Sequence, residues 1–105
     1  MTIKQSLETL GLPVAKSDYT GIEKTYITYF EYDENVEDSS DDEIATISHY
    51  IQVDLWTKTD YTNLKPQIKL AMKNAGFSFT NGQELFEEDT KTYHYATRYV
   101  AREDL

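Results

Sequence analysis

Two histidines are the side chains of this sequence best suited to bind a metal or transfer a proton, namely His49 and His94. Neither has a second histidine four residues away on a predicted helix, the spacing with which metalloproteases hold zinc. His49 falls among apolar residues on one face of a predicted strand, so we expect it to be a structural histidine of the core. His94 stands in a tyrosine-rich strand, and we expect it to be half exposed.

Other motifs that carry catalysis are missing from the sequence. There is no cysteine, which excludes a disulfide scaffold, a thiolate zinc site and a cysteine nucleophile. The four glycines are isolated and form neither a phosphate-binding loop nor a Gly-x-Ser-x-Gly elbow. We therefore expect a protein that is not an enzyme, with no catalytic residue, no cofactor and no metal site.

Charge is concentrated in one segment, residues 31–43. It holds eight acidic residues and no basic one, whereas the rest of the chain has 11 acidic and 10 basic residues. Such a self-repelling, apolar-poor segment predicts a mobile acidic loop at about 33–43. The loop has two interpretations: a solvated connection that aids solubility, or a negative surface that docks a basic partner or repels DNA phosphate.

Part of this segment matches the first ligand positions of an EF-hand calcium loop, at Asp33, Asn35 and Glu37. The required glycine is replaced by Asp38, and Ile44 stands where the bidentate glutamate belongs. The motif therefore fails, and only non-specific binding of divalent ions is left open.

Length and composition predict a single domain, residues 1–105, with a mass of 12.2 kDa. No apolar run is long enough to span a membrane, and the first residues lack the apolar core of a signal peptide. We therefore expect a cytoplasmic protein without membrane contact. A sequence pI near 4.5 argues against general binding to DNA or anionic lipid.

The first half of the chain predicts a helix and a long hairpin. Thr2 and Gln5 have the spacing of a capping box, and Gly11 is placed to end a helix over 3–10. The stretch 11–24 is expected to be irregular. Strands are expected at 25–32 and 44–57. The second alternates over a dozen residues, and its predicted core face holds Ala45, Ile47, His49, Ile51, Val53 and Leu55.

The second half predicts another helix and another hairpin. An apolar stripe favours a helix over 62–75, with Pro66 in its first turn. Strands follow from Phe77 and over 91–102, joined by a turn at 87–90, and Asn81-Gly82 indicates either a turn or a bulge. The order α-β-β-α-β-β predicts an α+β fold, with a mostly antiparallel sheet of about four strands in two hairpins packed against two helices.

Tyrosine is abundant, with nine residues, more than one thin core can bury. Aromatic residues with a polar tip, and arginine, are enriched at protein–protein interfaces. We therefore expect a subunit interface that includes Tyr93, Tyr95, Arg98, Tyr99 and Arg102.

Four short strings carry a family resemblance. They are Ile51-Gln52-Val53-Asp54-Leu55-Trp56, then Asn74-Ala75-Gly76-Phe77, then Glu84-Leu85-Phe86-Glu87-Glu88-Asp89-Thr90, and finally Tyr93-His94-Tyr95-Ala96-Thr97-Arg98-Tyr99. In this order the strings, and the region 44–102 that contains them, resemble the tail-terminator or tail-completion (head–tail joining) proteins of long-tailed bacteriophages and prophages.

The resemblance implies a virion assembly protein without catalytic residues. Such proteins form a ring, a hexamer, on the finished tail tube and offer a joining surface to the head connector. It implies copies of the chain, the tube protein and the connector as partners, without specific binding to the DNA that passes through. It also implies a location in the host cytoplasm during assembly and then at the head-proximal end of the virion tail.

Six copies of the acidic segment would repel DNA if they lined the channel of such a ring. The sequence equally allows the segment to face the connector or the tube. The residues expected to line the channel or to dock a partner are Glu34, Glu37, Asp38, Asp41, Asp42 and Glu43. An alternative function is that of an acidic DNA mimic that inhibits a nucleic-acid-processing protein, which needs acidic groups fixed on rigid elements.

Overall fold

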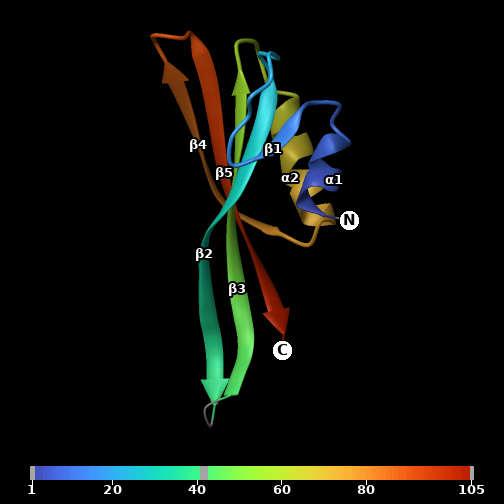
Figure 1. Ribbon diagram of the computed structural model, residues 1–105, viewed down its shortest axis with the longest axis vertical. Coiled ribbons are helices and arrows are strands. Elements are labelled where there is room, and N and C mark those ends of the chain that lie inside the picture. The colour runs from blue at the N-terminus through green and yellow to red at the C-terminus, as the bar shows by residue number, and fades with distance from the viewer. Residues whose placement is uncertain (1, 41–42, 105) are drawn as a thin grey trace.

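The computed structural model shows one five-stranded sheet with two helices on one of its faces (Figure 1). The structure describes residues 2–40 and 43–104, with side chains described outside 37–45. The elements are α1 (Ile3–Glu8), β1 (Val14–Lys16), β2 (Tyr26–Ser40), β3 (Glu43–Thr57), α2 (Leu64–Asn74), β4 (Ser78–Glu87) and β5 (Thr92–Asp104). Within these residues, neither helix has the length and apolar character needed to cross a bilayer.

The sheet has the strand order β1-β2-β3-β5-β4. All neighbours are antiparallel except β1, which pairs with β2 in parallel. The α+β class is therefore confirmed, but the expected antiparallel sheet of about four strands is corrected to a mixed sheet of five. Strand β1 was missed because three residues are too few to show a strand period.

The hairpin of β2 and β3 is longer than the sequence indicated. Both strands have 15 residues, and their far half extends beyond the helices (Figure 1). The expected loop at 33–43 is therefore corrected: residues 33–40 belong to β2, and Glu43 begins β3. A ladder of backbone hydrogen bonds needs no apolar side chains, so pairing with β3 can continue through an acidic sequence. Asp41 and Asp42 lie outside the described residues.

Both helices are punctuated as the sequence predicted. Thr2 and Gln5 form the capping box of α1, each side chain bonding to the other's backbone N–H. Helix α2 ends near Gly76, whose positive φ of 95° suits glycine. The Phe77 N–H then bonds back to the Met72 carbonyl at 2.9 Å. The start of α1 and the end of α2 could therefore be predicted from the residue types.

The second hairpin settles the choice at Asn81-Gly82. The register between β4 and β5 shifts between Phe79 and Asn81, so a bulge at Thr80 directly precedes Asn81-Gly82, and these two residues are paired with β5 and do not form the hairpin turn. The turn lies between Glu87 and Thr92, and includes Lys91 with a φ of 55°.

The core lies between the sheet and the two helices. Leu7 of α1 and Ile68 and Met72 of α2 are at most 1% exposed, and they share the core with Val53 and Leu55. The alternation of β3 was thus interpreted correctly where helices cover it. Farther along the same strand face, Ile47 and His49 are only half buried. His49 is consequently not a core histidine, because it lies past the end of the helix layer.

Candidate interaction surfaces

The face of the sheet opposite the helices is polar and aromatic. Gln52, Asp54 and Trp56 of β3 point to this face, as do His94 and Arg98 of β5, because side chains alternate along a strand. We call these five residues the polar network. The helices lie on the other side of the sheet (Figure 1), so this face is available to a partner wherever its own side chains do not fill it.

A hydrogen bond between two largely buried side chains, His94 and Asp54, lies at the centre of the polar network. His94 Nε2 lies 2.6 Å from Asp54 Oδ1, and the two side chains are 15% and 5% exposed. The Trp56 ring stacks on the imidazole with 3.8 Å between centroids. The Gln52 amide donates to the same carboxylate oxygen at 2.8 Å. These contacts satisfy the buried polar groups and hold the network in one arrangement.

The His94–Asp54 pair also has the form of the orienting half of a catalytic triad. In the part of the chain that the structure describes, no hydroxyl is hydrogen-bonded to His94. Without such a nucleophile, ring stacking and hydrogen bonding account for the pair. That the protein is not an enzyme stays a prediction.

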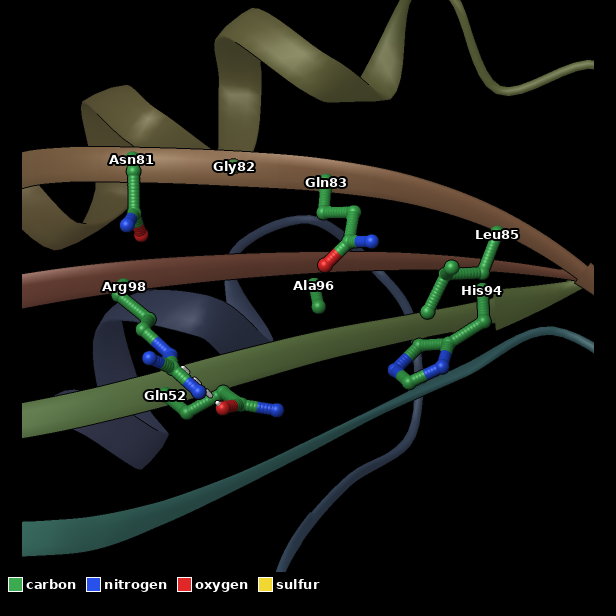
Figure 2. Close-up of a pocket in the computed structure, with 8 residues that line it drawn as sticks. All are labelled: Gln52, Asn81, Gly82, Gln83, Leu85, His94, Ala96 and Arg98. Atoms are coloured by element: carbon green, nitrogen blue, oxygen red, sulfur yellow. Dashed lines mark hydrogen bonds between the residues drawn. The ribbon is translucent and has the colours of Figure 1, made fainter.

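A hollow of about 340 Å³ lies on this face, and Figure 2 shows side chains from β3, β4 and β5 around it. It is lined by Gln52, Asn81, Gly82, Gln83, Leu85, His94, Ala96 and Arg98. Within it the Arg98 Nε–H donates to Gln52 Oε1 at 3.2 Å. Amide and guanidinium groups of this kind suit a partner that offers hydrogen-bonding groups.

The expected subunit interface divides between the two faces of β5. Tyr95 and Tyr99 are 4% and 0% exposed and pack in the core, so they are corrected to core residues. Burial raises the pKa of Tyr99 to about 12. They belong to the core because their face of β5 lies under the helices. Tyr93, Arg98 and Arg102 are exposed, and their role in an interface stays a prediction.

Strand β4 forms one edge of the sheet and was missed as a surface. Its ten residues are all exposed, and Phe79, Leu85 and Phe86 are each more than 40% exposed. Phe86 packs on Tyr93 with 4.9 Å between ring centroids. The only sequence signals were Phe79 and the apolar pair 85–86 in an otherwise polar strand. An exposed edge with apolar side chains is open to pairing with another chain.

A small network ties β4 to the segment before α2 and to the first turn of α2. Tyr61 donates to Glu84 Oε1 at 2.8 Å, and Lys65 donates to the same oxygen at 3.1 Å. Burial and then the Glu84 carboxylate raise the pKa of Tyr61 to about 12. The same two hydrogen bonds lower the pKa of Glu84. The edge strand is thereby held against the helix layer.

The acidic residues singled out in the sequence, apart from Asp41 and Asp42, lie on the far half of the β2–β3 hairpin, which we call the arm (residues 31–40 and 43–50). Glu34 is exposed there, directly opposite His49. Glu37 and Asp38 belong to β2 and Glu43 to β3. The structure therefore brings these residues onto one projecting hairpin.

His49, on the arm, is hydrogen-bonded through both ring nitrogens. Its Nδ1 lies 2.8 Å from Glu31 Oε1, and its Nε2 lies 3.1 Å from Glu103 Oε1. These hydrogen bonds, that to Glu31 first, raise the pKa of His49. No sequence spacing could have shown this cluster, because its members are 18 and 54 residues apart.

Comparison with known proteins gives a likeness of fold. No protein-family model matches the sequence, and no curated protein matches it. One solved structure with a similar chain is the virion of a native gene transfer agent (GTA) particle. The alignment covers 99% of this chain and 92% of that chain, with a TM-score of 0.68 and 17% sequence identity. At this identity the likeness shows that the two chains share a fold over nearly their whole lengths.

Proposed function

We propose that this chain is a structural protein of a phage-like virion that caps the completed tail tube as a ring and provides the joining surface for the head connector. The observation that carries the proposal is the likeness, over nearly the whole of both chains, to a component of a GTA virion. The strings within 44–102 that resemble tail-completion proteins support the same function.

A closed ring of identical subunits needs two different surfaces that fit each other, because its contacts run head to tail. The sheet offers two unlike edges. One is β4, which is paired on one side only. The other is β2 beyond Tyr29, where the three-residue β1 no longer covers it. The two edges lie on opposite sides of the sheet, which supports head-to-tail assembly around a ring.

The arm supports a role beside DNA. Glu31, Asp33 and Glu34 are exposed on its β2 strand, and the segment as a whole has eight acidic residues and no basic one. Copies of such an arm around a channel would repel phosphate and let DNA pass without binding. In this proposal the protein assembles in the host cytoplasm and remains at the head-proximal end of the tail.

The proposal can be tested through the exposed cations of β5. Native mass spectrometry of the protein mixed with purified tail tubes should show a ring, expected to be a hexamer, on the tube end. The double variant Arg98→Glu/Arg102→Glu should lose ring formation at least tenfold, whereas Lys24→Glu, in the loop before β2, should assemble normally. Equal assembly of both variants, or no association with tubes, would contradict the proposal.

One observation favours a second function, that of a DNA mimic. The acidic residues lie on a hydrogen-bonded hairpin rather than in a loop, so their charges are more fixed than the sequence indicated. Alternate residues on one strand face recur every ~6.6 Å, about half the charge density of a DNA strand. A tight 1:1 complex with a DNA-processing enzyme, dissolved by added salt, would support mimicry over ring assembly.

A further inference from the structure

Three strands bring one imidazole and three carboxylates together where the arm pairs with the end of β5. His49 is on β3, Glu31 and Glu34 are on β2, and Glu103 is near the end of β5. Oxygens of Glu31 and Glu34 and a ring nitrogen of His49 all lie within 4.8 Å of one another. Glu103 bonds the other side of the ring at 3.1 Å. This convergence lies on the helix-bearing face, just past the helices.

A β-bulge produces the convergence. Residues three apart in a regular strand point to opposite faces, so Glu31 and Glu34 should diverge. The register shifts between Glu31 and Asp33, which leaves Tyr32 as an extra residue. Glu34 then stands directly opposite His49, on the same face as Glu31. Bulges that redirect side chains in this way are concentrated near functional sites.

The second carboxylate on the imidazole distinguishes this cluster from a plain group of acids. Metal-binding histidines usually donate their other ring N–H to a carboxylate, which fixes the tautomer and orients the ring. Glu103 is placed to accept the proton of Nε2, which leaves Nδ1 directed at Glu31 at 2.8 Å. The side chains are 25% exposed for His49 and 37% for Glu31, so solvent can reach the site.

We propose that the arm binds one divalent transition-metal ion, of which zinc is the representative, through His49 Nδ1, Glu31 and Glu34, with Glu103 as the positioning residue. Imidazole nitrogen with carboxylate oxygen suits zinc, whereas calcium and magnesium prefer oxygen ligands alone. Three protein ligands leave a coordination position for water or for a group from a neighbouring molecule. The inference does not depend on the proposed function.

Cobalt(II) absorption and zinc calorimetry, with the full chain and the metal alone as probe, test the proposal. Wild type should bind one zinc ion per chain and give cobalt absorption bands in the visible range. His49→Gln should abolish the bands, and Glu34→Gln should weaken zinc binding at least tenfold. Glu103→Gln should weaken it about tenfold, within the range for residues that orient a metal ligand. Glu23→Gln, an exposed acid far along the chain from the cluster, should bind as wild type.

Circular dichroism and urea midpoints must show that each variant is folded. Imidazole resonances of His49 in NMR give a second readout, which should broaden selectively on addition of cobalt(II). Absence of cobalt bands in wild type, zinc binding retained by His49→Gln, or calcium binding equal to zinc binding would each overturn the proposal.

Discussion

The two halves of the β2–β3 hairpin share one backbone ladder and differ in almost everything else. Under the helices, Ile27, Val53 and Leu55 are at most 1% exposed. On the arm, Tyr32 and Val36 are 38% and 53% exposed among acidic neighbours. In the described part of the chain, no helix packs on the arm (Figure 1). The difference teaches that one half of the hairpin carries the stability, which leaves the side chains of the other half free for binding.

Truncation of one apolar side chain in each half of the hairpin is the strongest test of whether the two halves differ in their contribution to stability. Leu55→Ala removes core packing and should lower the free energy of unfolding by about 2–5 kcal/mol. Val36→Ala, on the arm, should change it by less than about 0.5 kcal/mol. Urea unfolding of both variants measures the contrast, and similar losses would refute it.

A smaller loss in the free energy of unfolding is expected for the polar network, which lies on the face of the sheet opposite the helices. Asp54→Ala leaves the His94 imidazole and the Gln52 amide without their buried acceptor. The expected cost is about 1–3 kcal/mol. Trp56 fluorescence should change in the same variant, since its ring stacks on His94. A double-mutant cycle with His94→Ala should show coupling, and simple additivity would argue against the pair.

Alkaline titration sharpens the comparison, because two tyrosines of the core, neither of them on the arm, have raised pKa values. Tyr61 and Tyr99 have a pKa of about 12 against an ordinary 10.0. The folded state favours their neutral forms, so their contribution is complete below pH 10 and is lost as the pH rises toward 12. Tyrosinate absorbance should show Tyr61→Phe removing one of the late-titrating groups, at a cost in the free energy of unfolding of about 0.5–1.5 kcal/mol near neutral pH.

The smallest effect is expected for charge removal on the arm. Glu34→Gln should alter the free energy of unfolding by less than about 0.5 kcal/mol. Hydrogen exchange should show amides near Asn35 exchanging faster than those near Val53, because few buried contacts hold the arm. Equal protection along the whole hairpin would contradict the division into two halves.

Sequence reasoning succeeded where local chemistry decides the structure. The capping box at Thr2 and Gln5, the end of α2 at Gly76 and the alternation through Ile51, Val53 and Leu55 could all be predicted. Each depends on residues within a few positions of one another.

Sequence reasoning failed where contacts between residues distant in the sequence decide the structure. The parallel strand β1 depends on pairing with β2. The ordered pairing of residues 33–40 depends on β3. Burial of Tyr95 and Tyr99 depends on where the helices end. The cluster around His49 additionally needs a bulge, for which the acidic sequence gave no signal.

The most direct test of the proposed function is electron microscopy of the tailed particles produced from the genome that encodes this chain, with and without its gene. The account predicts that loss of the protein gives overlong tubes, or tails of normal length that never join heads. It also predicts that antibody label lies at the head-proximal end of wild-type tails. Normal, joined particles without the protein, or purified particles that lack it, would contradict the account.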